Sequence, residues 1–221
     1  VRLRCRNAIP LARGLGSSAA AAVSGVLAAN VLAGLGWDEQ QVIGHAATIE
    51  GHPDNVAAAT LGGLAICVRD GPVIHLDVPD QLRAVIFIPD AEMSTEMARR
   101  VVPKQFSRED AVHNAARCAL LVAAMLTGEL GLLGEAMRDR WHQPFRGELM
   151  PHVPLLIEAA LGAGAHGACL AGAGPSVLAL VSGDDSAVGP TMEAAAAGAA
   201  VAGRAVTYRV RNFGARVDVA A

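Results

Sequence analysis

Aromatic side chains are scarce in this chain, which has two Trp, one Tyr and four Phe among 221 residues. A folded core must therefore be filled mainly by Ala, Val and Leu. A hydrophobic content of 52% is enough for one large core or two small ones, because domains usually hold roughly 100 to 150 residues. With 24 Gly for tight turns and close backbone contacts, the composition suits mixed α/β packing and permits two compact lobes.

The sequence also lacks an excess of basic charge, long apolar runs and paired cysteines. Its formal charge is -3, with acidic and basic residues mixed along the chain, which excludes a broad cationic surface for nucleic acid. No stretch reaches the roughly 18 uninterrupted apolar residues of a membrane span, so no membrane segment is expected. The cysteines show no CxxC spacing and mostly lie in apolar runs typical of a core, which indicates reduced thiols in the cytoplasm. They are Cys5, Cys67, Cys118 and Cys169.

A natural start is missing as well. Residue 1 is Val, and residues 1–9 alternate apolar side chains with Arg as in the middle of a sheet. We therefore expect that the chain is truncated or processed upstream, inside its first strand.

The first part of the chain has the pattern of a strand, a loop and two helices. The Ala and Leu content predicts a buried helix over residues 17–35 that closes at Gly36. Asp38 is placed to cap a second helix, which runs to about Glu50. Residues 64–68 and 73–78 have strand patterns, and a lobe boundary is expected near Pro79.

The second part is expected to alternate strands and helices. An apolar, β-rich run predicts a strand over residues 82–88 that ends at Pro89. Helices are predicted over residues 107–127, 130–141 and 154–163, and strands near Ala168 and Val177. Asp184 and Asp185 are expected to cap a last helix, and residues 205–210 to form the closing strand.

The segment PLARGLGSSAA, residues 10–20, has the features of a phosphate-binding loop. Gly14 and Gly16 allow the backbone to turn tightly, and Ser17 and Ser18 place hydroxyls beside the free amides of a helix start. Those amides and the helix dipole suit a phosphate, and one hydroxyl could reach a metal bound to it. The segment lacks GK[ST], so it is not a Walker loop, and a Gly-containing turn capped by Ser17 or Ser18 is the alternative interpretation.

The segment EGHPDN, residues 50–55, gathers polar side chains in one turn at a helix end. These are Glu50, His52, Asp54 and Asn55. Such a density is unusual in so apolar a neighbourhood, and Mg²⁺ prefers oxygen ligands of this kind. Taken alone, the segment also fits a simple turn in which His52 only bonds a neighbouring carbonyl.

Together, the two segments resemble the motifs of the GHMP kinases, the family of galactokinase, homoserine kinase, mevalonate kinase and phosphomevalonate kinase. PLARGLGSSAA followed by EGHPDNVAAATLGG carries the resemblance, and the HPDN form is similar to homoserine kinases in particular. A third, glycine-rich family motif is matched by LAGAGPSVLAL, which taken alone is an ordinary β-turn. STEMARRVVP, with Arg99, and QPFRGELMP, with Arg146, are also similar to homoserine kinases, so the resemblance covers the whole chain.

The resemblance implies an α/β class fold, more closely an α+β two-lobe GHMP kinase fold. Residues 1–78 would form the N-terminal, ATP-binding domain, a ribosomal S5 domain 2-like lobe truncated at its start. Residues 79–221 would form the C-terminal domain, a ferredoxin-like lobe.

The resemblance also implies sites for ATP and Mg²⁺. Ser18 and Glu50 would ligate the metal, with Ser17 as a rival ligand. The residues implied to bind ATP are Pro10, Leu11, Ala12, Arg13, Gly14, Leu15, Gly16, Ser17, Ser18, Ala19, Gly172 and Gly174.

His52, Asp54 and Asn55 would surround the hydroxyl of the acceptor, L-homoserine. Asn55 and Asp54 are the implied catalytic residues: Asn55 would position the hydroxyl, and Asp54 occupies the place of the Asp proposed as base in mevalonate kinase. Whether a base is needed stays open, because phosphoryl transfer passes through a loose transition state that positioning and charge neutralisation can stabilise.

Arg99 and Arg146 would bind the carboxylate of the amino acid, since the paired donors of a guanidinium match its two oxygens. Arg100 is the alternative to Arg99. Without the resemblance, these arginines would be interpreted as solvated surface charges.

The implied activity is that of a cytoplasmic transferase that phosphorylates the side-chain hydroxyl of L-homoserine with ATP, giving O-phospho-L-homoserine, a step of threonine and hence amino-acid biosynthesis. The substrate is a small molecule, and a homodimer is implied. Two departures stand out: Glu50 and His52 are nearly adjacent, and the family's first, N-terminal motif has no counterpart. The alternatives are a GHMP kinase for another small alcohol, of the mevalonate or sugar type, a non-catalytic nucleotide-binding module, and glycine loops that serve only packing.

Overall fold

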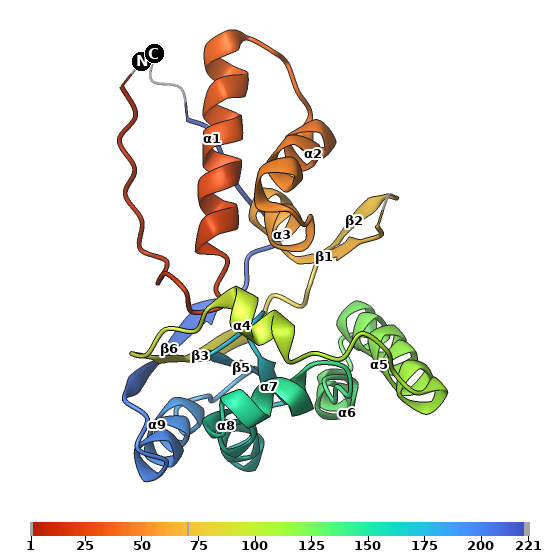
Figure 1. Cartoon of the computed structure of the whole chain (residues 1–221), viewed down its shortest axis with the longest axis vertical. Helices are drawn as coiled ribbons and strands as arrows, with labels where there is room; N and C mark the ends of the chain where they lie inside the picture. Colours follow the sequence, from red (N-terminus) through yellow and green to blue (C-terminus); the bar gives the residue numbers. More distant parts are fainter. Residues whose placement is uncertain (1, 70, 219–221) are drawn as a thin grey trace. The chain divides into compact units, whose positions relative to one another are not determined.

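The computed structural model describes residues 2–69 and 71–218 of the chain. Its contacts group the chain into two compact units (Figure 1). Unit 1 consists of Val1–Leu11, Gly16–Val78 and Arg211–Ala221, and unit 2 of Ala12–Leu15 and Pro79–Val210. Both helices and strands are present, as expected for the α/β class. Within the described residues, every helix is too short or too polar to cross a lipid bilayer.

Unit 1 packs short helices beside a hairpin. The helices are α1 (Ser17–Ala33), α2 (Glu39–Glu50) and α3 (Asp54–Leu61), and the antiparallel hairpin consists of β1 (Leu64–Cys67) and β2 (Val73–Leu76). The three helices contact one another, and α3 also contacts β1. Their shared core is made of small residues, as the shortage of aromatics predicts: Ala19, Val23, Val26, Val42, Ala46 and Val56.

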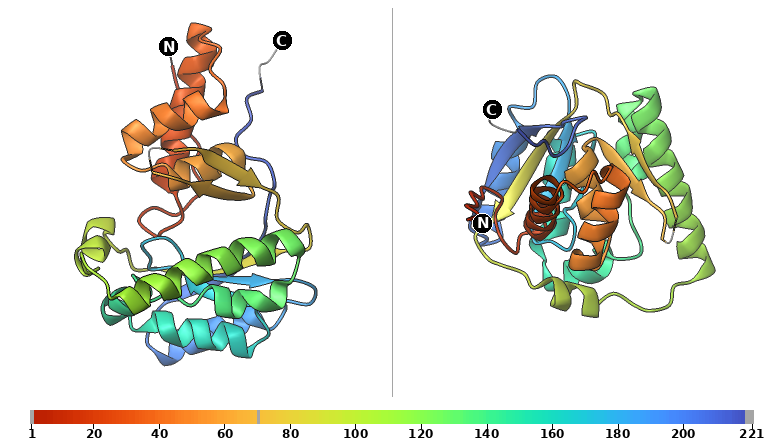
Figure 2. Two further views of the ribbon diagram at one scale, coloured as in Figure 1. Left: turned by 90° about the vertical axis from the view of Figure 1, so that its right-hand side faces the viewer. Right: turned by 90° about the horizontal axis from the view of Figure 1, so that it is seen from above.

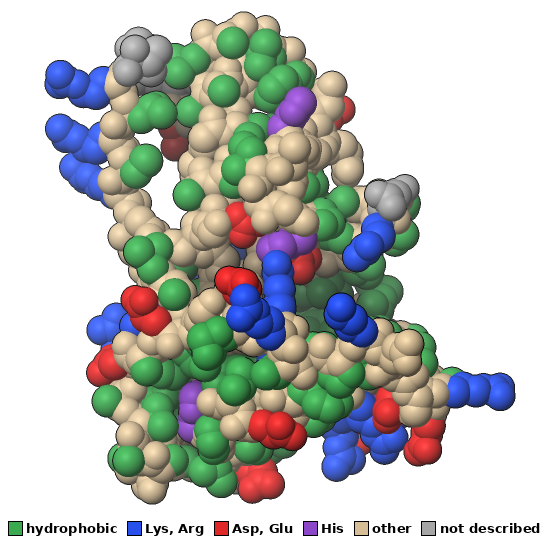
Figure 3. All heavy atoms as spheres, in the orientation of Figure 1, with side chains coloured by type: hydrophobic (Ala, Val, Ile, Leu, Met, Phe, Trp, Pro, Cys, Tyr) green, Lys and Arg blue, Asp and Glu red, His purple; other side chains and the backbone are tan. Residues whose placement is uncertain are grey.

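The boundaries of α1 and α2 follow from their end residues. Asp38 caps α2 as predicted: its carboxylate accepts from Gln41 N–H at 2.8 Å, and the Gln41 side chain accepts from Asp38 N–H at 3.0 Å. Helix α1 ends at Ala33 because Gly34 adopts a left-handed conformation, two residues before the predicted Gly36. The C-terminal end of α1 exposes apolar side chains, among them Leu32, which is 63% exposed. Figure 3 shows hydrophobic side chains on this part of unit 1.

The predicted N-terminal strand over residues 1–9 is wrong for the described residues 2–9, and Val1 lies outside them. Residues 2–8 are exposed and have no strand partner within the described chain, and alternation without a partner does not make a strand. Asn7 instead fixes the end of this segment. Its side-chain nitrogen donates to the Ile9 carbonyl and to Ser17 Oγ, both at 3.0 Å.

The end of the described chain, residues 211–218, returns to unit 1. Gly63 N–H donates to the Arg211 carbonyl at 2.7 Å, and Asn212 exchanges two hydrogen bonds with the Val78 backbone. A Cβ on Gly214 would lie 2.2 Å from the Thr60 carbonyl oxygen, so only glycine fits there. The contacts thus group this segment and residues 12–15 differently from the continuous ranges 1–78 and 79–221, which stay predictions; residues 219–221 lie outside the described chain.

The sheet of unit 2 is antiparallel, with the strand order β4-β5-β3-β6. Its strands are β3 (Arg83–Pro89), β4 (Gly167–Leu170), β5 (Val177–Val181) and β6 (Gly203–Arg209). Val85 of β3 lies opposite Ala179 of β5 and Thr207 of β6. The first strand in sequence thus lies between the third and the fourth, which is the order of the ferredoxin-like βαββαβ fold expected for the second lobe.

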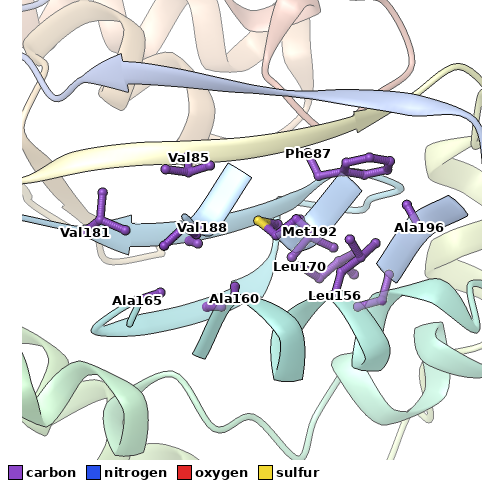
Figure 4. Packing of buried hydrophobic residues seen from close by; sticks show 14 of the residues in the cluster. Val85, Phe87, Leu156, Ala160, Ala165, Leu170, Val181, Val188, Met192 and Ala196 are labelled. Atoms are coloured by element: carbon purple, nitrogen blue, oxygen red, sulfur yellow. The ribbon is translucent and has the colours of Figure 1, made fainter. Parts of the chain in front are cut away.

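Two helices, α8 (His152–Gly162) and α9 (Val188–Gly198), pack against each other and against this sheet. Figure 4 shows Val85 and Phe87 of β3 pointing toward Leu156 of α8 and Met192 of α9. All four side chains are fully buried. This layer is the main hydrophobic core of unit 2.

The remaining helices of unit 2 are short, apart from α5 (Arg108–Thr127), which packs beside α6 (Figure 2). They are α4 (Thr95–Arg100), η1 (Leu130–Leu132), α6 (Leu133–Ala136) and α7 (Gln143–Leu149). The prediction missed α4 and α7. The single helix predicted over residues 130–141 is instead η1 followed by α6, which ends at Ala136, and Asp139 beyond it bonds the backbone of residues 141–143.

Two further sequence expectations are wrong in detail. Asp184 bonds Ser186 N–H at 3.1 Å and does not cap α9, which begins at Val188 without a side-chain cap. All four cysteines are free thiols, as expected, but Cys5 and Cys118 are exposed rather than buried, because residues 2–8 do not join a sheet and Cys118 lies on an outer face of α5.

The core of unit 2 gives a direct test of this packing. Leu156→Ala removes a fully buried side chain and should lower the free energy of unfolding by about 2–5 kcal/mol. The neighbouring Leu155, 48% exposed on the same helix, is the matched control, and its replacement by Ala should cost under about 0.5 kcal/mol. Urea unfolding measures both, and equal losses would contradict the assignment of the core.

Candidate active site

The start of α1 leaves backbone amides open in the predicted phosphate loop. Gly16 is the N-cap in a left-handed conformation, with φ of 73° and no side-chain cap. The first bond of the helix runs from Ala20 N–H to the Gly16 carbonyl at 3.0 Å, so the amides of Ser17, Ser18 and Ala19 precede it. Neither serine caps the helix, which contradicts the simple-cap alternative. Open amides at the positive end of a 17-residue helix suit an anion.

The two serines have different partners. Ser18 Oγ donates to Glu50 Oε2 at 2.5 Å, whereas Ser17 Oγ accepts from the Asn7 side chain. This arrangement favours Ser18 over Ser17 as the partner of Glu50 at a metal. A hydroxyl and a carboxylate fit Mg²⁺, which is often held by one or two protein oxygens while phosphate and water supply the rest. In the described residues no three His, Cys, Asp or Glu side chains form a metal cluster, so the protein alone would not complete the ligand set.

The HPDN turn places polar groups beside the start of α1. Asp54 Oδ1 accepts from Asn55 N–H at 2.7 Å and lies 2.6 Å from His52 Nδ1. Asp54 Oδ2 has no hydrogen-bond partner in the described part of the chain. A Cβ built on Gly16 would lie 3.9 Å from Asn55 Cγ, so the Asn55 amide is next to the loop. Unit 1 therefore brings Gly16, Ser18, Glu50 and Asn55 together, although they come from two separate motifs.

The Asp54 carboxylate also affects the pKa of a thiol, that of Cys67. Burial raises the pKa of Cys67, and the negative charge of Asp54 raises it further. Cys67 therefore stays protonated at neutral pH and is a poor nucleophile. We assign it no chemical role.

In unit 2, Gly14 lies close to the glycine-rich segment that contains Gly172 and Gly174. Gly14 has φ of 71°, and a Cβ on it would lie 2.2 Å from the Ala171 carbonyl oxygen and 2.9 Å from Gly174 N. A Cβ on Gly172 would lie 3.0 Å from the Gly14 carbonyl oxygen. The backbones of the RGLG and AGAG segments are thus in contact, and side chains at these positions would separate them. Sequence reasoning proposed both segments but not their contact.

Arg13 fastens this loop to the end of β3. Its Nε donates to the Pro89 carbonyl at 2.7 Å, its Nη2 to the Asp90 carbonyl at 2.5 Å, and its Nη1 pairs with Glu92 at 3.2 Å. The Ala12 carbonyl accepts from Met93 N–H at 3.2 Å. The side chain of Arg13 is thus engaged by the protein, a function that the motif did not indicate.

Arg146 on α7 is half-buried and bonds backbone carbonyls on both sides. Its Nε donates to the Ala98 carbonyl and its Nη1 to the Gly172 carbonyl, each at 3.0 Å, and Nη1 also lies 3.2 Å from His142 Nδ1. Burial lowers the pKa of Arg146, Asp139 raises it and Arg99 lowers it. Three of its five donors are used, and in the described structure only the two hydrogens of Nη2 have no partner.

Arg99 and Arg100 differ in whether their side chains have a partner. Arg100 pairs with Glu96 one turn earlier on α4, at 2.6 Å. Arg99 is exposed, its side chain has no hydrogen-bond partner in the described part of the chain, and it is near enough to Arg146 to affect its pKa. This geometry favours Arg99 over Arg100 as a ligand for a carboxylate.

Two family models match the sequence. Residues 1–63 match the model described as GHMP kinases N terminal domain, and residues 121–190 match GHMP kinases C terminal. A homoserine kinase from Moorella thermoacetica is 44% identical over 198 residues, which are 88% of this chain and 67% of that protein.

The chain belongs to the GHMP kinase family.

Other relatives of this GHMP kinase carry the same name. A homoserine kinase from Thermus thermophilus is 48% identical over 181 residues, 81% of this chain and 62% of that protein. A crystal structure of homoserine kinase from Cytophaga hutchinsonii aligns with a TM-score of 0.87 and 31% identity, over 94% of this chain and 69% of that one. The chain spans about three fifths to two thirds of the length of the curated relatives reported.

The contact between the two glycine loops can be tested by adding a methyl group. Gly14→Ala should both lose stability and reduce the increase in melting temperature that Mg-ATP causes, because the loops would separate. Gly34→Ala is the control, since Gly34 is also left-handed, with φ of 61°, but has open space around it. Gly34→Ala should lower the free energy of unfolding only by the conformational strain, about 1–2 kcal/mol. It should leave the increase in melting temperature with Mg-ATP unchanged. Equal behaviour of the two variants in thermal unfolding would contradict the close contact.

Proposed function

We propose that the protein transfers the γ-phosphate of ATP to the side-chain hydroxyl of L-homoserine and forms O-phospho-L-homoserine, a step of threonine biosynthesis. The observation that carries the proposal is the open start of α1 with the Ser18–Glu50 pair and Asn55 beside it. Relatives at 44% and 48% identity that are named homoserine kinase support the choice of acceptor.

The amides of Ser17, Ser18 and Ala19 would donate hydrogen bonds to the phosphates of ATP. Ser18 and Glu50 would hold Mg²⁺, which when bound neutralises the charge of the phosphates. Gly14, Gly172 and Gly174 would shape the loops, and the side chain of Arg13 would hold its loop on β3.

Asn55 would orient the attacking hydroxyl with its amide. Asp54 would accept the proton of that hydroxyl on Oδ2 as the oxygen–phosphorus bond forms and ADP leaves, because Oδ1 already binds His52 and Asn55 N–H. His52 would hold the Asp54 carboxylate in place. The carboxylate of the substrate would be bound by Arg99, which is exposed, and by Nη2 of Arg146.

Location in the cytoplasm and a homodimer remain predictions within this proposal. A sugar kinase would need no carboxylate-binding arginine pair, a mevalonate kinase would bind a carboxylate but no amino group, and a non-catalytic nucleotide-binding module would need no Asp54 or Asn55. No observation in the structure favours either one over a homoserine kinase.

A panel of acceptors tests the proposal. ADP release should be fastest with L-homoserine and slower by at least about tenfold in kcat/KM with L-serine, L-threonine or mevalonate, because a binding difference of about 1.4 kcal/mol is tenfold. Turnover that favours mevalonate would contradict the acceptor assignment. Stabilisation by Mg-ATP without turnover of any acceptor would favour a binding module, and no stabilisation at all would contradict the nucleotide site.

The metal assignment has its own test. Glu50→Gln keeps the shape but removes the charge, so the Mg²⁺ concentration needed for half-maximal activity should rise by about tenfold or more. Glu39→Gln, at the exposed start of the same helix, is the control and should leave the Mg²⁺ requirement unchanged. An equal Mg²⁺ requirement in both variants would remove Glu50 from the metal site.

A further inference from the structure

The carboxylate of Asp139, between α6 and α7 in unit 2, is saturated with hydrogen bonds. Oδ1 accepts from the Asn114 side chain at 2.6 Å and from Trp141 N–H at 3.1 Å. Oδ2 accepts from His142 N–H and Gln143 N–H, both at 2.7 Å. Four bonds match the four lone pairs of a carboxylate. Its side chain is only 12% exposed, so the aspartate is a structural anchor and not a surface charge.

The ionised form of Asp139 is favoured in spite of burial. Burial raises its pKa, but the bonds from Gln143, His142 and Asn114 outweigh this effect, and the pKa lies below its usual value. The side chain is therefore charged at neutral pH and accepts all four bonds at once.

The anchor ties the start of α7 to two other elements. Asn114 is a buried residue of α5, and its side-chain Oδ1 also accepts from Arg140 N–H at 2.9 Å. Gln143, the first residue of α7, accepts from Leu170 N–H of β4 at 2.8 Å and donates to the Met137 carbonyl at 3.2 Å. The position of α7 is thus fixed by hydrogen bonds to α5 and to the strand that leads into the glycine-rich turn.

His142 connects this anchor to Arg146. An arginine nitrogen can only donate, so the contact between Arg146 Nη1 and His142 Nδ1 requires an unprotonated Nδ1. The proton of the neutral ring then sits on Nε2, which lies 3.8 Å from Asp139 Oδ2. Burial lowers the pKa of His142, Asp139 raises it and Arg146 lowers it, with the neutral form favoured overall.

We propose that Asp139 and His142 are positioning residues that orient Arg146 so that Nη2 alone is presented to the carboxylate of the acceptor. Asp139 fixes the first turn of α7, and His142 accepts one hydrogen of Nη1. The Gly172 carbonyl accepts the other, and the Ala98 carbonyl takes the hydrogen of Nε. Arg146 therefore connects α4 and the glycine-rich turn to α7 through hydrogen bonds. Arg99 would then be the arginine that binds both oxygens of the carboxylate with paired donors.

This inference rests on the proposed function and is tested with Asp139→Asn. The amide nitrogen of Asn cannot accept from His142 N–H and Gln143 N–H, so Arg146 should lose its orientation and the KM for L-homoserine should rise by about tenfold or more. The KM for ATP should change by less than about threefold. Glu148→Gln is the control, since it removes a carboxylate on α7 that has no hydrogen-bond partner within the described residues, and both KM values should stay near those of the unmodified protein.

A pH series separates positioning from a general loss of structure. The charged groups that face His142 are Asp139 and Arg146, and Arg99 of α4 acts on Arg146 in turn. Because the pKa of His142 is lowered, the ring takes up a proton only at a pH below the pKa of an ordinary imidazole, and Nδ1 can then no longer accept from Nη1. The KM for L-homoserine should then rise in the unmodified protein but stay flat in His142→Gln, whose side-chain oxygen accepts at any pH.

The outcomes are distinguishable. If the unmodified protein does not turn over L-homoserine, the proposed function fails. If it uses L-homoserine but Asp139→Asn behaves like Glu148→Gln, or the pH profiles of His142→Gln and the unmodified protein coincide between pH 5 and 8, the positioning role is wrong. Should Asp139→Asn fail to fold, Asn114→Ala removes the 2.6 Å bond to Asp139 together with the bond from Arg140 N–H, and must raise the KM for L-homoserine more than the KM for ATP.

Discussion

The contact between two backbone segments without side chains is the constraint on which the candidate nucleotide site depends. Gly14 approaches Ala171 and Gly174 so closely that a single methyl group would overlap a carbonyl oxygen. The side chain of Arg13, the residue before Gly14, donates to the Pro89 carbonyl at the end of β3. The side chain of Arg146 donates to the Gly172 carbonyl. Glycine is required here because two backbone segments of the same chain are in contact. The left-handed φ of Gly14 is a second reason.

Polar side chains in unit 2 act mainly on the backbone. The side chains of Arg13, Asp139, Gln143 and Arg146 all form hydrogen bonds with backbone groups of helices, strands or loops. Each is partly buried, so a lost bond would leave an unsatisfied peptide group as well as a free side chain. In this unit, charged and polar side chains therefore contribute to the geometry of the glycine-rich loops.

Much of the fold could be predicted from local signals. The Asp38 cap, the strands around Ala168 and Val177 and the long helix after Ser107 were all visible in the sequence. The strand predicted over residues 1–9 is wrong for the described residues 2–9, because alternation indicates a strand only when a partner is present. Helix α7 was missed because Asp139 and Gln143 begin it through contacts with α5 and β4, which are distant in sequence.

The motifs likewise indicated which residues belong to the candidate site but not how they are used. Ser18 and Glu50 form a pair as the spacing of the motifs permits, whereas the engagement of Arg13 and Arg146 with carbonyls has no sequence signal. The central claim is transfer of phosphate to a hydroxyl of homoserine, and phosphorus NMR of the protein with Mg-ATP and L-homoserine tests it most directly. A phosphomonoester signal that grows in step with ADP is predicted. Formation of inorganic phosphate alone, or no change in ATP, would contradict the account.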